Sequence, residues 1–245
     1  MLSLSNRIFL GLVCSLTFLT GIAVFLPQGS MVKGQSLPAS RPVIALVSAV
    51  AVFIIYGGLG WLGLFLSRKL GFKEIWAPDV SNRQRFIIPM MAGGAAGIFM
   101  IAADAVLSRL HGLGPLPHPL FPTSIVASAT AGIGEEIVFR LFFISFWVWL
   151  ISAVILKNRW QSQVFWAVSV ISAMAFAFGH LPSILMLYGF RDFGAMPPAL
   201  LVELILLNGV IGITCAYFMR KYGFLGAVGV HFWADIVWHV IYGLF

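Results

Sequence analysis

Seven apolar runs, each long enough to cross a lipid bilayer, occupy most of this chain of 245 residues. A helix rises about 1.5 Å per residue, so about 20 consecutive apolar residues span the hydrocarbon core. The chain is 60% hydrophobic and only 9% charged, which leaves too much apolar surface for a water-soluble domain of this size. We predict an all-α bundle of about seven transmembrane helices, or eight if one segment is broken or re-entrant. The expected helices cover residues 8–26, 43–66, 86–110, 123–150, 164–180, 198–218 and 225–245.

The connecting segments are too short to fold independently, so residues 1–245 are expected to form a single integral membrane domain. The first apolar run is longer than the apolar part of a signal peptide, and we expect it to be retained as a helix. No internal repeat is visible, so the inverted repeats of many transporters have no support here. Cys14 and Cys215 both lie in apolar runs, where cysteine behaves as a small hydrophobic residue.

The net charge of +7 could suggest nucleic-acid binding, but the basic residues lie between the apolar runs and not along one face. They therefore indicate topology, and no nucleic-acid partner is expected. By the positive-inside rule, we predict a multi-pass protein of the cell membrane with a cytoplasmic N-terminus. The end that holds the N-terminus has Arg7, Arg68, Lys69, Lys73, Arg83, Arg85, Lys157, Arg159, Arg220 and Lys221, and the other end has Lys33, Arg41, Arg109 and Arg191.

Several ionisable residues lie inside the apolar runs, where hydropathy alone would exclude them. A charged group near the centre of a bilayer costs at least about 2.5–3.5 kcal/mol, so each such residue indicates a partner, a cavity or a function. We expect the site inside the bundle, in a motif-bearing core over residues 123–245. The candidates are Asp104, Glu135, Glu136, Arg140, His180, Glu203, His231, Asp235 and His239.

Two adjacent glutamates in the fourth run have different expected roles. Glu136 and Arg140 are four residues apart, so they lie on one helix face and can neutralise each other as structural support. Glu135 is turned about 100° around the helix axis and has no basic residue at i+3 or i+4. Its partner must come from another helix. A purely structural ion network of both glutamates is the alternative interpretation.

Two histidines in later runs complete a possible hydrolytic site. His180 ends the fifth run, and His231 in the seventh run has Asp235 one helical turn later. A carboxylate without a local partner and two membrane histidines supply what hydrolysis in lipid requires: a base, a group that holds the water and donors for an oxyanion. His239 continues the face of His231 but lies near the chain end, and Asp104 and Glu203 are expected to contribute less.

These residues form three short motifs in the order found in a known family. Glu-Glu-x-x-x-Arg at residues 135–140, Phe-x-x-x-His at 176–180 and His-x-x-x-Asp at 231–235 lie on successive membrane helices. Together they resemble the motifs of the CAAX-protease and bacteriocin-processing (CPBP) family of intramembrane proteases, which includes the type II CAAX prenyl endopeptidases. The first 120 residues match this family only as membrane helices.

The resemblance implies an intramembrane endopeptidase that hydrolyses a peptide bond through a glutamate-activated water. In that scheme, Glu135 is the general base and holds the water with His180. His231 and Asp235 stabilise the oxyanion, and Glu136 with Arg140 supports the site. Asp235 departs from the family pattern, because Asn, a ready donor, often stands there.

We expect no cofactor and no metal, although the same four catalytic candidates offer N and O ligands that could hold a divalent ion such as Zn²⁺. The expected partners are the lipid bilayer and a peptide or membrane-protein substrate, prenylated or not. Two other functions fit the same residues. One is a membrane protein that binds a peptide or confers bacteriocin immunity without catalysis, and the other is a proton-coupled carrier, since Glu, Asp and His also form membrane proton relays.

Overall fold

The computed structural model of the chain describes residues 2–29 and 38–245. Within these ranges there are seven helical segments long and apolar enough to cross a membrane, as predicted. Lys33, which counts among the basic residues above, lies outside the described residues. The segments are Leu4–Ala23, Arg41–Lys69, Arg83–His111, Thr123–Ile155, Gln161–Tyr188, Pro198–Tyr222 and Phe224–Leu244.

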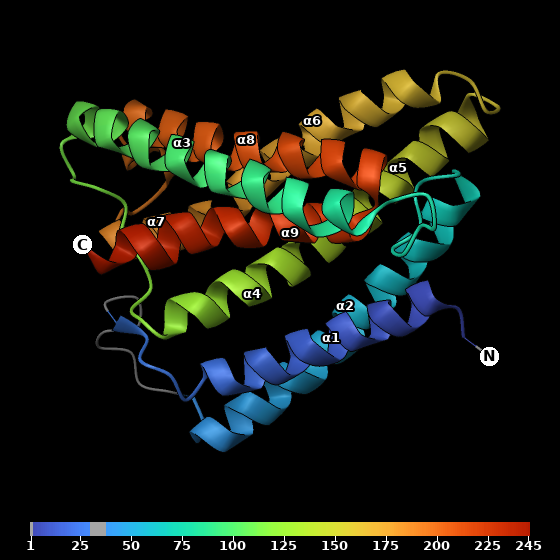
Figure 1. Ribbon diagram of the computed structural model, residues 1–245. Coiled ribbons are helices and arrows are strands. Elements are labelled where there is room, and N and C mark those ends of the chain that lie inside the picture. Colours follow the sequence, from blue (N-terminus) through green and yellow to red (C-terminus); the bar gives the residue numbers. More distant parts are fainter. Residues whose placement is uncertain (1, 30–37) are drawn as a thin grey trace.

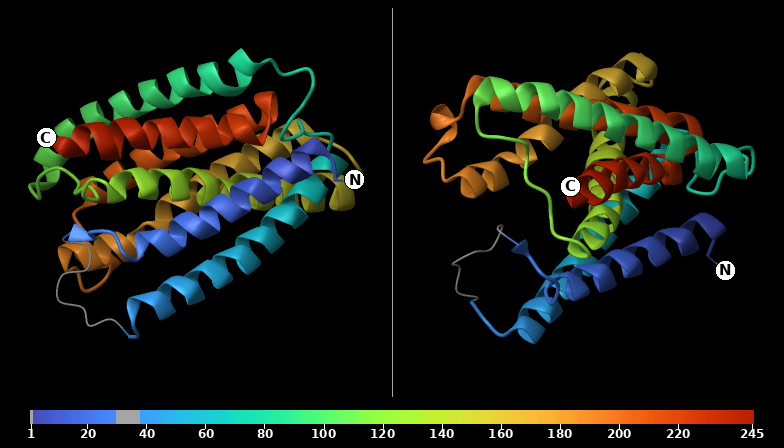
Figure 2. Two further views of the ribbon diagram at one scale, coloured as in Figure 1. Left: turned by 60° about the horizontal axis from the view of Figure 1, so that its bottom comes forward. Right: turned by 60° about the vertical axis from the view of Figure 1, so that its left-hand side comes forward.

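The helices form one elongated bundle with the two termini at opposite ends (Figure 1). The first two segments, α1 (Leu4–Ala23) and α2 (Arg41–Lys69), pack as a pair on one side of the bundle, as Figure 2 also shows. The last helix, α9 (Phe224–Asp235), lies in the middle and packs on α3 (Ile88–His111), α4 (Thr123–Glu136) and α8 (Pro198–Tyr222). Since α9 carries His231 and Asp235, the third motif is central to the fold.

Proline and glycine set several of the helix ends. Proline stands in the first turn of α2, α3 and α8, where its missing N–H would have no helical partner. Gly112 ends α3 with a φ of 72°, the left-handed conformation that glycine adopts without strain.

The fifth membrane segment is broken, and the sequence predicted only its first part. α6 (Gln161–Gly179) ends before His180, and α7 (Leu181–Tyr188) begins directly after it, with Pro182 in its first turn. Proline therefore restarts the helix here and does not begin a loop, which is why the helical segment extends eight residues beyond the predicted end.

Two helices change to π-helical geometry immediately after motif residues. α4 ends at Glu136 and continues as a π-helix over Ile137–Ile144, and α9 ends at Asp235 and continues as a π-helix over Ile236–Ile241. The wider π turn changes the direction of the side chains that follow it. π-Helical turns are rare and often occur at functional sites.

Glycines allow α3 to approach α9 closely. A Cβ atom built on Gly97 would lie 2.8 Å from the carbonyl oxygen of Ala234, and one built on Gly93 would collide with the carbonyl oxygen of Val230. Gly93 and Gly97 are four residues apart, the small-xxx-small spacing that lets membrane helices pack backbone against backbone. Their contacts fall next to His231 and Asp235, so this packing fixes the helix that carries them.

We expect Gly97→Ala to destabilise the protein by about 1–3 kcal/mol, the usual cost of overpacking a close contact. Gly94→Ala is the matched control, because a Cβ atom at Gly94 meets no other atom within 4 Å. The control should leave stability unchanged or raise it by about 0.5–1 kcal/mol, since alanine is the better helix former. Thermal unfolding in detergent measures both variants, and equal melting temperatures would show that the α3–α9 contact does not require glycine.

Candidate active site

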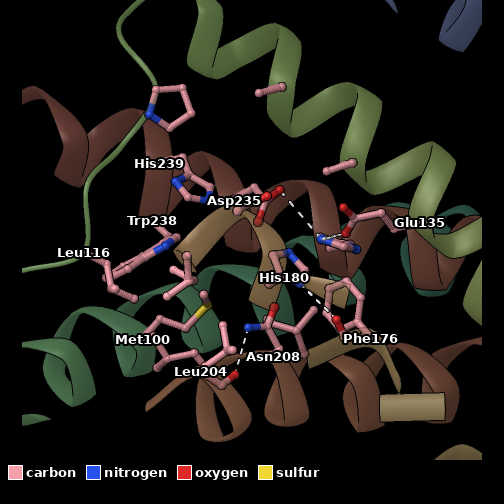
Figure 3. Close-up of a pocket in the computed structure, with 18 of the residues that line it drawn as sticks. Met100, Leu116, Glu135, Phe176, His180, Leu204, Asn208, Asp235, Trp238 and His239 are labelled. Carbon is pink, nitrogen blue, oxygen red and sulfur yellow. Dashed lines mark hydrogen bonds and ion pairs between the residues drawn. The ribbon is translucent and has the colours of Figure 1, made fainter. Parts of the chain in front are cut away.

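The structure brings the four predicted catalytic residues to the wall of one cavity of about 250 Å³. Glu135 comes from the end of α4, His180 from the junction of α6 and α7, and His231 and Asp235 from α9. Figure 3 shows Glu135, His180 and Asp235 around this cavity. The three motifs therefore meet in space, although they are spread over about 100 residues of sequence.

Glu136 is completely buried and has two partners. Its Oε1 atom lies 3.1 Å from Nη1 of Arg140, the pair predicted from the i,i+4 spacing. The same oxygen lies 2.8 Å from Nδ1 of His231, a contact between helices that the sequence did not reveal. A carboxylate that pairs with a guanidinium is an acceptor, so His231 donates this hydrogen bond from Nδ1 to Glu136. Glu136 thus fixes the orientation of the His231 ring.

The second nitrogen of His231 lies between the other two carboxylates. Nε2 is 3.6 Å from Oε2 of Glu135 and 3.7 Å from Oδ2 of Asp235, within ion-pair range but beyond hydrogen-bond distance. The Glu135 side chain is 32% exposed, whereas that of Glu136 is fully buried. Of the two adjacent glutamates, Glu135 is therefore the one that faces the cavity. The partner expected for Glu135 from another helix is His231.

The hydrogen bond of His180 determines its tautomer. Nδ1 lies 2.9 Å from the backbone carbonyl oxygen of Phe176, which can only accept, so Nδ1 carries the proton. In the neutral ring, Nε2 then carries a lone pair. His180 can therefore accept a hydrogen bond or a proton from a water molecule in the cavity.

Phe176, the first residue of the second motif, connects the three motifs. Its ring packs edge-on against His180 at a centroid distance of 5.0 Å and against His231 at 5.7 Å. The guanidinium carbon of Arg140 lies 4.7 Å from the centroid of the same ring. The aromatic ring therefore holds both histidines and provides a favourable face for the buried cation. The motif is visible in the sequence, but the contacts of the Phe176 ring with both histidines and Arg140 are not.

The remaining walls of the cavity are mainly apolar, with three further polar side chains. Ser183, Asn208 and His239 line it together with the predicted residues. His239 was a sequence candidate, but nothing in the pattern singled out the other two. The apolar lining residues are Met100, Leu116, Pro117, Pro119, Ala127, Ala131, Phe176, Ile184, Leu187, Leu204, Leu207, Ile211 and Trp238.

A second group of buried ionisable residues lies beyond the cavity and does not line it. Asp104 accepts a hydrogen bond of 3.0 Å from the backbone N–H of Leu116, and His111 lies 2.8 Å from Glu203. Glu203 is fully buried. Because Leu116 lines the cavity, Asp104 anchors a segment of its wall.

His118, in the segment between α3 and α4 that also contains Leu116, contacts the C-terminal helix. Its Nδ1 atom lies 3.1 Å from Nδ1 of His239, and its ring packs edge-on against Trp238 and Tyr242. Burial lowers the pKa of His118, and the negative charge of Asp104 offsets this only in part. A neutral His118 ring suits the contact, because only one proton fits between the two Nδ1 atoms.

The residues proposed as metal ligands from the sequence do not form a compact ligand set. Among the described residues, the one such group with its ligand atoms within 4.8 Å of one another consists of Glu136, Cys215 and His231. Glu136 already contacts His231 and Arg140, and Sγ of Cys215 lies 3.5 Å from the carbonyl oxygen of Ala227. With a guanidinium 3.1 Å from its carboxylate, this group suits a cation poorly.

The fold and the site define a multi-pass membrane protein that carries carboxylate and imidazole groups around a cavity inside its helix bundle. The family model described as type II CAAX prenyl endopeptidase, Rce1-like, matches residues 117–237, about half of the chain. The chain belongs to this CAAX protease family, and endopeptidase activity in the membrane is its function at the level of the family. Neither the curated proteins nor the solved structures include a significant match.

Proposed function

We propose that this protein hydrolyses a peptide bond with a water molecule activated by Glu135. One observation carries the proposal: Glu135, His180 and His231 line one cavity, while Glu136 beside Glu135 is engaged with Arg140 and His231. The division of roles between the two glutamates follows from their surroundings. Only Glu135 is free to take a proton from water.

In the proposed first step, the Glu135 carboxylate removes a proton from a water molecule held by Nε2 of His180. The water oxygen then bonds to the carbonyl carbon of the peptide, and the carbonyl electron pair moves to the oxygen. In the second step, that pair returns, the C–N bond breaks, and Glu135 gives its proton to the leaving amine. The products are a carboxylic acid and an amine, and Glu135 returns to its starting state.

His231 is proposed to stabilise the oxyanion formed in the first step. Its Nδ1 proton is committed to Glu136, so Nε2 donates when the ring is protonated, as an imidazolium. Glu135, Glu136 and Asp235 surround this ring and can balance its charge. A donor held in place before the reaction stabilises developing charge without reorganisation. Asp235 is proposed to support His231, or to donate directly when protonated.

The test is purified protein in detergent or lipid with a library of fluorogenic peptides, each made with and without a C-terminal prenyl group. We expect cleavage by the wild type and none by Glu135→Gln. Prenyl-dependent cleavage would assign a prenylated substrate, and cleavage of both forms would assign an unmodified peptide. Saturable binding with no cleavage of any peptide would replace the protease by a peptide-binding protein.

We expect the activity to persist after exhaustive chelation, with well below one equivalent of zinc in the active protein, because a carboxylate base needs no metal. Asp235→Asn separates the two mechanisms, since an amide can donate to an oxyanion but is a poorer metal ligand than a carboxylate. This variant should retain activity in the metal-free scheme. A stoichiometric metal that Asp235→Asn expels, with activity restored by metal addition, would contradict the proposal.

A further inference from the structure

The cavity extends from the catalytic candidates toward only one end of the bundle. Leu116, Pro117 and Pro119 line it from the segment between α3 and α4, and His239 lines it from the C-terminal helix. The lining includes no residue of 70–82, 156–160 or 223, the connections at the opposite end. Substrate that enters the cavity from the aqueous phase therefore comes from the end at which the chain terminates (Figure 1).

The two ends of the bundle differ strongly in charge. Of the Lys and Arg residues that the structure describes, Arg140 is buried at the site, ten lie at the end that holds the N-terminus, and three, Arg41, Arg109 and Arg191, lie at the cavity end. Such asymmetry in short connections places the basic end in the cytoplasm. The cavity extends away from that end.

On the basis of the proposed function, we infer that the substrate is a short, uncharged and extended peptide segment presented from the extracytoplasmic side of the membrane. The position of the cavity and the distribution of basic residues together indicate the side of the membrane from which the substrate comes. The size of the cavity and the chemistry of its walls indicate that the substrate segment is short, uncharged and extended.

A cavity of about 250 Å³ is smaller than most ligand sites, which measure about 300–1,000 Å³. It can hold a few residues of extended chain but no folded element. Apart from the candidate catalytic groups and His239, its polar side chains are Ser183 and Asn208, which carry no charge. Away from the catalytic candidates and His239, a charged substrate residue would lose its hydration without gaining a charged partner.

The side of access is tested with sealed right-side-out and inverted membrane vesicles from cells that express the full chain. The probe is the best fluorogenic peptide found with detergent-solubilised protein, made membrane-impermeant by charged tags outside the cleaved segment. We expect right-side-out vesicles to cleave it at the rate measured after detergent is added, and inverted vesicles to be at least tenfold slower until detergent opens them. The opposite pattern overturns the inference and leaves the proposed function intact.

Thiol labelling gives an answer that does not depend on activity. In a Cys14→Ser background, Leu113→Cys places a thiol in the exposed segment at the cavity end, and Ser81→Cys places one in the exposed connection at the basic end. Cys215 is buried. An impermeant maleimide should label Leu113→Cys in right-side-out vesicles and Ser81→Cys only in inverted ones. The reverse labelling overturns the inference, even if no peptide is cleaved in detergent and the proposed function itself fails.

Discussion

Replacing Glu135 by Gln should reduce peptide hydrolysis by at least about 100-fold, the lower limit for losing a positioned general base. The amide keeps the size of the side chain but cannot take a proton from water. The fold should survive, because the Glu135 side chain is 32% exposed and its contact with Nε2 of His231, at 3.6 Å, is longer than a hydrogen bond. Initial rates with the best library peptide measure the effect. Glu74→Gln, in the connection at the opposite end of the bundle, is the matched control and should keep full activity.

The two histidines should behave in the same way for different reasons. His180→Ala removes the acceptor for the water, and His231→Ala removes the proposed oxyanion donor, each with a loss of at least about 100-fold. Near-normal turnover of any one variant would exclude that residue from the mechanism. If Glu135→Gln and both histidine variants all remain active, the peptidase site must lie elsewhere.

Arg140→Ala should destabilise the protein by about 3–5 kcal/mol, the usual cost of leaving one member of a buried ion pair without its partner. Arg140 and Glu136 are both fully buried, and their charged atoms are 3.1 Å apart. The variant would also lose the contact between the guanidinium and the ring of Phe176. Melting temperature in detergent measures the effect, which should far exceed that of Glu135→Gln.

A double variant separates charge from packing at this pair. Glu136→Gln combined with Arg140→Gln leaves no isolated charge, so it should be more stable than Arg140→Ala. If Arg140→Ala instead melts like the wild type but has no activity, Arg140 acts directly on the substrate and its assignment as structural support is wrong.

The membrane helices could be predicted because their signal lies in composition and length alone. Each apolar run is visible without knowledge of its neighbours, and seven spans are found where seven were expected. The break at His180 was harder to predict. Pro182 is compatible both with a helix end and with the first turn of a new helix, and only the packing of α7 over the cavity decides between them.

The candidate site could be predicted only where its residues are near one another in sequence. The Glu136–Arg140 pair follows from helical spacing, as does the placement of Asp235 one turn after His231. The hydrogen bond from His231 to Glu136 joins residues 95 positions apart. It depends on how closely α4 and α9 pack, which no local pattern encodes.

The exposure of α7 gives this bundle a part that can vary independently of the rest. None of the eight residues of α7 is buried, yet Ser183, Ile184 and Leu187 line the cavity. Substitutions at positions outside a packed core usually change stability by less than about 0.5 kcal/mol. Relatives that keep the helices of the candidate site could therefore diverge in substrate preference through these eight residues, and α7 is the place to exchange residues when redirecting the enzyme to a new peptide.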